Sequence, residues 1–293
     1  MSAGSALPSG AGLITSRQNA RVQELAKLRT SGFRRETGLF LIEGLREISR
    51  ALAAGAAIRE VYFQPALFRQ AQTAHALLAS AARRGAGLCE LSPGAFEKVS
   101  AREGADGLLA TATTPDVSLD ALAAGLGAGE NNPGAPAPLF LVAEAVEKPG
   151  NLGALFRTAD SAGGTALLCC DPVADVFNPN AVRASQGALF SVPCAVGTPG
   201  EIAAFLARRN VSVFATSPAA ETCYWDADFR RPAAILLGSE KDGLSPFWLT
   251  PDRRPSNLSV LPISIPQSGL SDSLNVGMAA AICLYEARRQ RAL

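Results

Sequence analysis

Histidine is the residue that this chain most nearly lacks, since only His75 occurs among its 293 residues. A zinc site of the His-Glu-x-x-His kind needs two histidines, and a Ser-His-Asp triad would depend on His75 alone. His75 lies in an Ala-rich stretch that predicts a helix, where a surface or half-buried position is the simpler interpretation. The sequence therefore predicts no metal site and argues against triad hydrolysis.

The cysteines form no Cys-x-x-Cys pair, which argues against zinc ribbons and thioredoxin-like redox sites. Six scattered cysteines in a chain that is 48% hydrophobic are typical of small buried side chains in a reducing compartment. The first ten residues lack the features of a signal peptide, and the apolar runs are shorter than the ~18 residues of a membrane span. We therefore expect a cytoplasmic protein with no membrane partner.

The common nucleotide motifs are also missing. No Gly-x-Gly-x-x-Gly follows a strand-like run, and no Gly-Lys pair of a P-loop occurs. The stretch Arg183-Ala-Ser-Gln-Gly187 is close to a nucleophile elbow, but it begins with Arg and has no histidine near it. A ligand of this chain must be bound by some other arrangement.

A composition change divides the chain. The stretch from Asp120 to Pro138 is built mainly from Ala, Gly, Asn and Pro, which favour neither helix nor strand, so we interpret residues 116–137 as a linker. Residues 1–115 hold 14 Lys and Arg against 9 Asp and Glu, a net charge of +5, and the remainder carries −4. Basic residues crowd residues 17–35, which favours phosphate binding, with a solvated helix face as the alternative.

Helical and strand-like stretches alternate in both parts. Residues 1–115 predict a small α/β sandwich, with helices over 18–29, before Gly55, through His75 and near Phe96, and strands at GLFLIEG, IREVYFQ, GLCEL and GLLATAT. Residues 138–293 predict a parallel sheet covered on both faces, because its strands are short and continuously apolar: LFLVAEAV, TALLCC, VPCAV, VSVFATS, AAILLG and LSVLPISI. Helices are expected at 151–163, 179–186, 199–209, near Phe247 and at 273–291.

Three segments of the second part follow predicted strands and carry polar residues. In the first, Asn151 is a candidate helix N-cap and Arg157 lies off the apolar stripe, so the helix start favours an anion. In the second, the strand ends at Gly238, where a ligand could approach the backbone, and Glu240 follows. In the third, Ser273 and Asn275 enter an apolar helix, and capping would explain only one of them. Taken singly, each segment could also be an ordinary turn.

Together, in this order and spacing, the segments resemble the signature motifs of the SpoU-type (TrmH-like) RNA 2′-O-ribose methyltransferases of the SPOUT superfamily. The family patterns are Asn-x-Gly-x-x-x-Arg, Gly-x-Glu-x-x-Gly and Ile-Pro…Gly…Ser-Leu-Asn-Val, and a further family stretch is similar to FNPNAVRASQGALFSVP. The matching residues are Asn151, Gly153, Arg157, Gly238, Glu240, Gly243, Ile265, Pro266, Gly269, Ser273, Leu274, Asn275 and Val276.

This resemblance implies an α/β SPOUT domain with a deep trefoil knot over residues 138–293. Residues 1–115 look like the L30e-like α/β sandwich that binds the RNA substrate in many relatives. The enzymes are homodimers, and the last helix has apolar residues for an interface (Leu274, Ile282, Leu284 and Tyr285), with packing inside one chain as the alternative. The implied cofactor is S-adenosylmethionine, bound at Thr216, Leu237, Gly238, Gly243, Ile265, Pro266, Gly269 and Leu274.

The implied reaction is methyl transfer to a ribose 2′-hydroxyl of structured RNA, with Arg157, Asn151, Glu240, Ser273 and Asn275 as catalytic residues. Family schemes let the arginine activate the hydroxyl, but a guanidinium with a pKa above ~12 is a poor base. We therefore favour Arg157 as the group that holds an RNA phosphate and stabilises the alkoxide. The expected RNA contacts are Arg17, Arg21, Arg29, Arg34, Arg35 and Arg183.

The sequence leaves alternatives open. A SPOUT base methyltransferase is disfavoured by the Ser-Leu-Asn-Val stretch, and a non-catalytic RNA-binding protein is disfavoured by the intact polar residues of all three segments. Ribosomal RNA, 23S in particular, is favoured over tRNA as the substrate because of the first domain. The modified nucleotide, and the choice between routine modification and antibiotic resistance, stay open.

Overall fold

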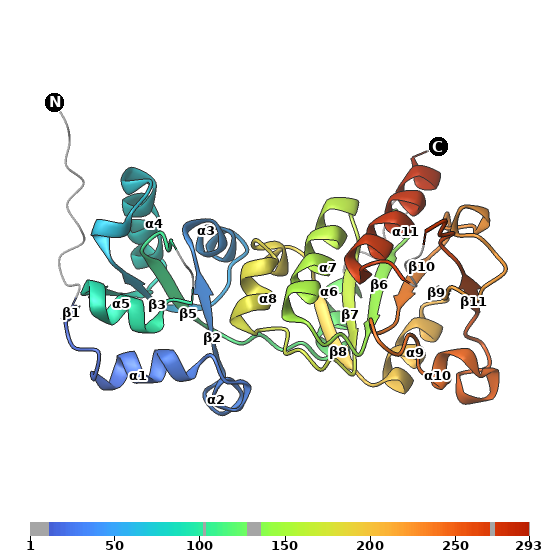
Figure 1. Ribbon diagram of the computed structural model, residues 1–293, viewed down its shortest axis with the longest axis horizontal. Coiled ribbons are helices and arrows are strands. Elements are labelled where there is room, and N and C mark those ends of the chain that lie inside the picture. The colour runs from blue at the N-terminus through green and yellow to red at the C-terminus, as the bar shows by residue number, and fades with distance from the viewer. Residues whose placement is uncertain (1–11, 102–103, 128–135, 270–272, 293) are drawn as a thin grey trace. The chain divides into compact units, whose positions relative to one another are not determined.

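The computed structural model describes residues 12–101, 104–127, 136–269 and 273–292 (Figure 1). The chain divides into two compact units. Unit 1 contains Met1–Pro115 and Phe177–Phe190, and unit 2 contains Asp116–Val176 and Ser191–Leu293. The sequence placed Phe177–Phe190 with the second domain, but the structure groups it with unit 1. The physical reason is aromatic packing, because the rings of Phe177 and Phe190 lie 4.8 and 6.4 Å from that of Phe40.

Unit 1 contains a five-stranded mixed sheet in the order β1-β4-β3-β5-β2. Its strands are β1 (Gly12–Ile14), β2 (Leu39–Glu43), β3 (Ile58–Phe63), β4 (Gly87–Leu91) and β5 (Leu108–Thr113). Its helices are α1 (Ala20–Lys27), α2 (Ser31–Thr37), α3 (Leu45–Ala53), α4 (Ala71–Arg83), α5 (Pro93–Val99) and α8 (Pro179–Ala184), with short 3-10 turns η1 (Pro65–Leu67) and η2 (Ala188–Phe190). The predicted strands and helices of residues 1–115 are confirmed, whereas β1 and α2 were not predicted.

Helix α1 shows how the local sequence sets an element of unit 1. The side chain of Asn19 caps the helix by accepting a hydrogen bond from the backbone N–H of Arg21 at 2.9 Å. Val22, Leu25 and Leu28 follow at helical spacing and are buried in the core of the unit. Arg21 and Lys27, the basic residues of this helix, lie on its remaining, exposed side.

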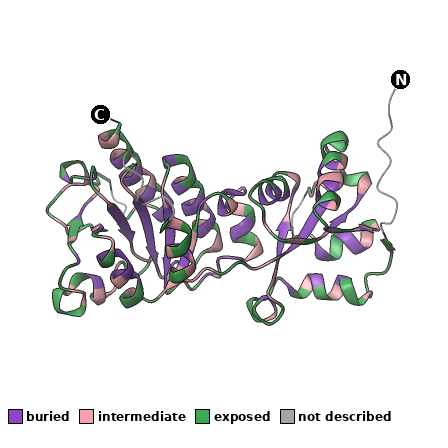
Figure 2. Ribbon diagram, turned by 180° about the vertical axis from the view of Figure 1, so that it is seen from behind, coloured by how far each residue is buried: buried purple, intermediate pink, exposed green. Residues whose placement is uncertain are grey.

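Unit 2 contains a six-stranded sheet in the order β11-β9-β10-β6-β7-β8, and its strand pairs are all parallel. The strands are β6 (Leu139–Glu144), β7 (Ala166–Cys170), β8 (Cys194–Gly197), β9 (Ser212–Thr216), β10 (Ala233–Leu237) and β11 (Val260–Ile263). Strands β6, β7 and β10 are buried along their whole length (Figure 2). The predicted parallel sheet and its strands are thus confirmed.

Helices cover this sheet: α6 (Leu119–Gly127), α7 (Pro149–Ala162), α9 (Pro199–Arg208), α10 (Pro246–Leu249) and α11 (Val276–Arg291), with 3-10 turns η3 (Tyr224–Asp226) and η4 (Pro251–Arg253). Helices α7 and α11 pack on each other, and the Arg288 guanidinium donates to the Ser161 carbonyl at 3.1 Å (Figure 1). Gly163 ends α7 in the left-handed conformation, as predicted.

Helix α6 lies within residues 116–137, which were interpreted as a linker with no helix expected. Leu122 is buried in the core of unit 2, and Leu119 and Leu126 pack against the same core. Leucines at this spacing give the helix an apolar stripe, and its burial outweighs the low helix propensity of the glycines. Residues 128–135 of the predicted linker lie outside the described residues.

Candidate active site at the carboxyl edge of the parallel sheet

Three neighbouring strands of unit 2 end side by side at one edge of the sheet. Thr216 ends β9 and is paired in register with Ile263, which ends β11, while Leu237 ends β10 on the other side of β9. The Thr216 hydroxyl donates to the Leu236 carbonyl at 3.0 Å. In parallel α/β sheets this carboxyl edge is the usual ligand side. Two of the predicted cofactor positions lie at these strand ends: Gly238 directly follows β10, and Ile265 lies two residues after the end of β11.

A chain of hydrogen bonds joins the three sequence segments at this edge. The Asn151 side-chain amide donates to the Glu240 carboxylate, and the Asn275 amide donates to Asn151 Oδ1 at 3.2 Å. The three residues come from α7, from the loop after β10 and from the start of α11. The structure therefore brings together side chains that are separated by up to 124 residues.

Asn151 does not have its predicted role of helix cap, whereas Asn275 is the one of the two polar residues in its segment that capping explains. Helix α7 begins at Pro149 with Lys148 as its N-cap, so Asn151 lies in the first turn and is not the cap. Proline suits a first helical position because it lacks an N–H, which lets the helix start earlier. Asn275 is the N-cap of α11, and its Oδ1 accepts from the Gly277 N–H at 2.9 Å. Asn275 thus caps a helix with its oxygen and binds Asn151 with its nitrogen, while Ser273 is exposed beside it.

Arg157 lies two turns into α7 and points away from the core. Leu152, Leu155 and Phe156 are fully buried, as the apolar stripe predicted, whereas Arg157 is exposed. Within the described part of the chain its guanidinium makes no hydrogen bond or ion pair. A guanidinium that is always charged and has five free donors is suited to an anionic group.

The turn after β10 explains why residue 238 is a glycine. A Cβ at Gly238 would lie 2.2 Å from the carbonyl carbon of Gly243, which has a φ of +69°. The Ser239 N–H donates to the Gly243 carbonyl at 2.9 Å, and the Gly243 N–H donates to the Ser239 carbonyl at 3.2 Å. The missing side chain at Gly238 thus lets the chain fold closely on itself, and this closed turn presents Glu240 to Asn151.

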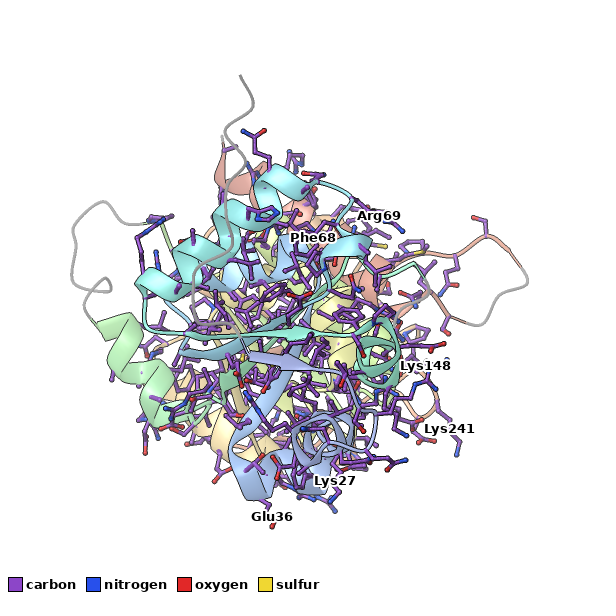
Figure 3. The ribbon with its side chains drawn as sticks, turned by 90° about the vertical axis from the view of Figure 1, so that its left-hand side faces the viewer. Lys27, Glu36, Phe68, Arg69, Lys148 and Lys241 are labelled. Carbon is purple, nitrogen blue, oxygen red and sulfur yellow. The ribbon has the colours of Figure 1, made fainter. Side chains whose placement is uncertain are left out.

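Two exposed lysines flank this site and were not singled out from the sequence. Lys148 immediately precedes α7, and Lys241 follows Glu240 (Figure 3). Their positions in the sequence could have identified them, because each lysine lies beside the polar residues of one of the three segments. The other predicted cofactor positions differ in exposure: Leu274 and Ile265 are half-buried, whereas Pro266 and Gly269 are exposed.

The structure corrects one of the predicted RNA contacts in unit 1. Arg34 is only 3% exposed, and its guanidinium donates to the Leu28 carbonyl at 2.8 Å. A buried guanidinium that holds the chain in this way cannot reach an RNA phosphate. Arg35, its neighbour, is exposed and has no hydrogen-bond or ion-pair partner among the described residues.

The other predicted RNA contacts are exposed arginines with partners of their own. Arg17 donates to the Gly94 carbonyl at 2.9 Å and pairs with Glu97, and Arg21 pairs with Glu60. Arg29 donates to the carbonyls of Val99 and Ser100 at 2.8 and 2.6 Å. Arg183, on α8, donates to Asn180 Oδ1 at 3.2 Å. These arginines remain at the surface, but binding RNA would compete with the contacts they make here.

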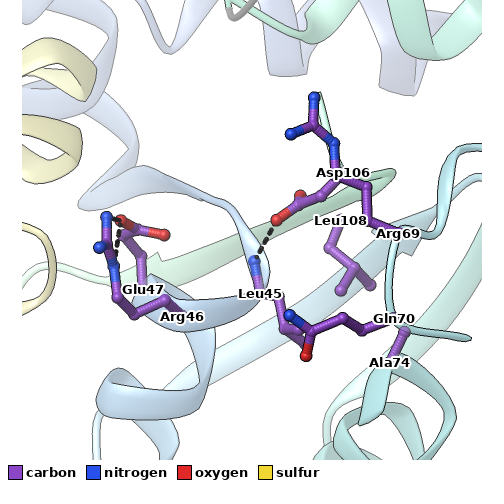
Figure 4. Close-up of a pocket in the computed structure, with 8 residues that line it drawn as sticks. All are labelled: Leu45, Arg46, Glu47, Arg69, Gln70, Ala74, Asp106 and Leu108. Carbon is purple, nitrogen blue, oxygen red and sulfur yellow. Dashed lines mark hydrogen bonds and ion pairs between the residues drawn. The ribbon is translucent and has the colours of Figure 1, made fainter. Parts of the chain in front are cut away.

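Unit 1 also contains a small cavity of about 210 Å³ beside the start of α3 (Figure 4). Asp106 Oδ2 accepts from the Leu45 N–H at 2.9 Å, and the other oxygen of Asp106 is buried without a hydrogen-bond partner among the described residues. Arg46 and Arg69 bring positive charge to the lining. No sequence motif pointed to these residues.

The described residues form neither a metal site nor a membrane-spanning helix. Within the described ranges no group of three or more His, Cys, Asp or Glu side chains is placed to hold a metal ion. No helix in the same ranges is long and apolar enough to cross a membrane. The six cysteines are free thiols, and burial raises the pKa of Cys283 to about 12.

Comparisons with known proteins match both parts of the chain. Residues 138–285 match the SpoU rRNA Methylase family, and residues 19–110 match an MRM3-like substrate binding domain. The chain is 38% identical to a 23S rRNA (uridine(2479)-2′-O)-methyltransferase of Streptomyces viridochromogenes over 49% of this chain and 50% of that protein. It is 30% identical to an uncharacterized tRNA/rRNA methyltransferase of Synechocystis over 95% of this chain and 94% of that protein.

A solved structure extends this similarity over nearly the whole chain. It is the SpoU methyltransferase AviRb from Streptomyces viridochromogenes in complex with the cofactor AdoMet. The two structures superpose with a TM-score of 0.79 at 29% sequence identity, over 94% of this chain and 99% of that one. The fold described above is therefore similar to that of a protein crystallised with S-adenosylmethionine.

Proposed function

The chain belongs to the SpoU rRNA methylase family, and from this premise we propose that it transfers a methyl group from S-adenosylmethionine to a ribose 2′-hydroxyl of structured RNA. The favoured substrate is 23S ribosomal RNA, with tRNA as the second candidate. The observation that carries the proposal is the hydrogen-bond chain through Glu240, Asn151 and Asn275 at the carboxyl edge of the sheet. It unites the polar residues of three distant segments where a ligand of a parallel sheet is bound.

The residues at this edge fit S-adenosylmethionine. Half-buried Ile265 and Leu274 offer apolar surface for an adenine ring, and the Glu240 carboxylate offers a counter-charge for a cationic ligand. The strand ends offer backbone donors and acceptors beside them. We propose that the cofactor is held by Thr216, Leu237, Gly238, Gly243, Ile265, Pro266, Gly269 and Leu274.

When bound, S-adenosylmethionine supplies a methyl group on a positively charged sulfur, which can react with an oxygen nucleophile. The protein's own task is to align the reactants, and good alignment contributes on the order of 7–11 kcal/mol. Asn151, Glu240 and Asn275 restrain one another through their hydrogen bonds, so none is free to rotate away. We propose that these residues, together with Ser273, position the ribose and the cofactor.

Arg157 is proposed to hold the RNA phosphate next to the target ribose. Its guanidinium is exposed and positively charged, so it stabilises the oxygen as the 2′-hydroxyl loses its proton. The proton leaves to that phosphate or to water, because a guanidinium is a donor only and has no site that accepts a proton.

We propose that unit 1 grips the RNA in the manner of an L30e-like domain, through Arg17, Arg21, Arg29 and Arg35, with Arg183 on α8. The net charge of +5 over residues 1–115 supports this. Membership of this family also supports our proposals of a trefoil knot within residues 138–293 and of a cytoplasmic location.

The homodimer also remains a proposal, supported by exposed apolar side chains on α11. Met278 is 62% exposed and Tyr285 is 50% exposed. Leu284, also predicted to lie in the interface, is fully buried in its own chain and cannot contribute to it. The interface would therefore use the face of α11 that carries Met278 and Tyr285.

The proposed substrate is tested by label transfer from S-adenosylmethionine to separate RNAs. Purified protein is incubated with methyl-labelled cofactor and with unmodified 23S rRNA, 16S rRNA or total tRNA, beside the Arg157→Ala variant. We expect label in 23S rRNA with the wild type and little with the variant. Transfer to tRNA alone would move the substrate, and transfer to none by a protein that binds the cofactor would favour a non-catalytic RNA-binding role.

A further inference from the structure

Glu144, at the end of β6, is a buried carboxylate that the proposed mechanism does not use. The residue is only 4% exposed. Its Oε2 accepts from the Ser245 N–H at 2.8 Å, and its Oε1 accepts from the Ser245 hydroxyl at 2.6 Å and from the Trp248 indole N–H at 3.1 Å. A buried charge is costly unless its hydrogen bonds are satisfied, and here three donors converge on one carboxylate.

The three donors belong to the chain that follows the Glu240 loop. Ser245 is the N-cap of α10, and Trp248 on that helix is 1% exposed. The loop of residues 238–245 is thereby fixed at three points: the closed turn between Gly238 and Gly243, the bond from Asn151 to Glu240, and the attachment of Ser245 to Glu144.

The backbone after Glu144 is fixed as well. Ala145 has a φ of +51°, a left-handed conformation that is uncommon for any residue other than glycine. Its N–H donates to the Cys170 carbonyl at 2.9 Å, and the Val146 carbonyl accepts from the Ala174 N–H at 3.0 Å. The surrounding chain therefore sets the direction in which the segment leaves Glu144 and continues to Asn151.

Glu144 thus stands between two of the segments that form the site. It is seven residues before Asn151 on one side, and its hydrogen bonds hold the base of the Glu240 loop on the other. We propose that Glu144 is a positioning residue: its carboxylate sets the 238–245 loop so that Glu240 meets Asn151 and the cofactor contacts at Gly238 and Gly243 are preformed. This inference rests on the proposed function, because it assigns that loop to cofactor binding.

The carboxylate, rather than an amide of the same shape, is what the site requires. In Glu144→Gln the oxygen can keep the Ser245 hydroxyl and the Trp248 indole, but the new NH2 group then faces the Ser245 backbone N–H, so two donors oppose each other. Ser245→Ala, in contrast, removes one donor and leaves the carboxylate its two N–H partners. We therefore expect Glu144→Gln to disturb the loop more than Ser245→Ala does.

The test compares Glu144→Gln and Ser245→Ala with Glu201→Gln. Glu201 belongs to the capping box at the start of α9, so its variant makes the same chemical change at a site that serves stability alone. For each folded variant, the Kd for S-adenosylmethionine is measured by calorimetry at a temperature well below its Tm. We expect the Kd to increase about 10-fold in Glu144→Gln and by less in Ser245→Ala, and to stay within about twofold in Glu201→Gln.

Hydrogen exchange of the backbone amides of residues 239–245 provides a second readout that needs no cofactor. Faster exchange there in Glu144→Gln, with unchanged exchange in α9, supports the positioning role. An unchanged Kd and unchanged exchange in a folded Glu144→Gln would overturn it, even if its Tm falls. A wild type that binds no S-adenosylmethionine would instead overturn the proposed function, and the exchange measurement would still decide whether Glu144 orders the loop.

Discussion

The closed turn between Gly238 and Gly243 should tolerate no side chain at its first residue. In Gly238→Ala the new Cβ would lie 2.2 Å from the Gly243 carbonyl carbon and 2.5 Å from the Leu244 nitrogen. Ordinary contact begins at 3.4 Å, so the Gly243 backbone must move by about 1.2 Å. A movement of this size breaks both hydrogen bonds between Ser239 and Gly243 and draws Glu240 away from Asn151.

The cost follows from these two hydrogen bonds. At about 0.5–1.5 kcal/mol each, their loss lowers the free energy of unfolding by about 1–3 kcal/mol. A chain of this size loses about 2–4 °C in Tm per kcal/mol, so the Tm should fall by about 2–12 °C. Each 1.4 kcal/mol that is passed on to ligand binding weakens S-adenosylmethionine binding about tenfold.

Thermal unfolding and calorimetric titration of Gly238→Ala with S-adenosylmethionine measure both effects. Gly200→Ala is the matched control, because a Cβ at Gly200 in α9 meets nothing within 4 Å and alanine favours a helix by about 0.5–1 kcal/mol. We expect the control to melt at or above the wild-type temperature and to bind normally. A Gly238→Ala protein that matches the control in both measurements would refute the reasoning.

Three further predictions follow from single side chains. Arg157→Ala should lower kcat about 100-fold or more, with little change in the Kd for S-adenosylmethionine. The kcat of Arg157→Lys should also stay well below that of the wild type, because lysine lacks the bidentate fork of a guanidinium. Near-normal turnover of the lysine variant in a label-transfer assay would contradict this role. Arg35→Ala should weaken RNA binding and reduce the slope of its salt dependence by about 1, at an unchanged Tm. Arg34→Ala should instead lower the Tm, because it removes a buried hydrogen bond. Equal salt slopes for the wild type and Arg35→Ala in anisotropy titrations would show that Arg35 does not contact the RNA. Burial raises the pKa of Cys283 from 9.0 to about 12, so this thiol ionises at a lower pH in the unfolded chain than in the folded one, and the free energy of unfolding should fall as the pH rises from about 9 toward 12. Urea titrations at pH 8 and 10.5 should show a smaller fall in Cys283→Ala than in the wild type. An equal fall in both proteins would contradict the assignment to Cys283.

Much of the fold could be predicted because local pattern and tertiary structure agree in unit 2. Continuous apolar runs such as Leu139–Glu144 and Ala233–Leu237 occur in strands that are buried on both faces, and the structure places them in the middle of a parallel sheet. Helix α6 was missed because its glycines obscure the leucine stripe. The grouping of Phe177–Phe190 with unit 1 was missed because it depends on ring contacts with Phe40, more than 130 residues away in the sequence.

The sequence indicated which segments bring polar residues to one edge of the sheet, but not how those residues connect. The three polar segments could be placed at strand ends and helix starts, and the structure joins Asn151, Glu240 and Asn275 there. Residue spacing alone could not show that Asn151 follows the helix cap or that Arg34 points inward, because both depend on tertiary packing. Glu144 had no sequence signal beyond a charge at the end of an apolar run, and its meaning depends on the register that brings Ser245 to it.

The central claim is methylation of a ribose oxygen, and the position of the methyl group in the product tests it most directly. RNA that has been labelled by the purified wild type is digested with nuclease P1, dephosphorylated and separated into nucleosides by chromatography with mass detection. The account predicts that the label appears in a single 2′-O-methylated nucleoside and disappears with Arg157→Ala. A label on a nucleobase would contradict the account and place the chain with the base methyltransferases.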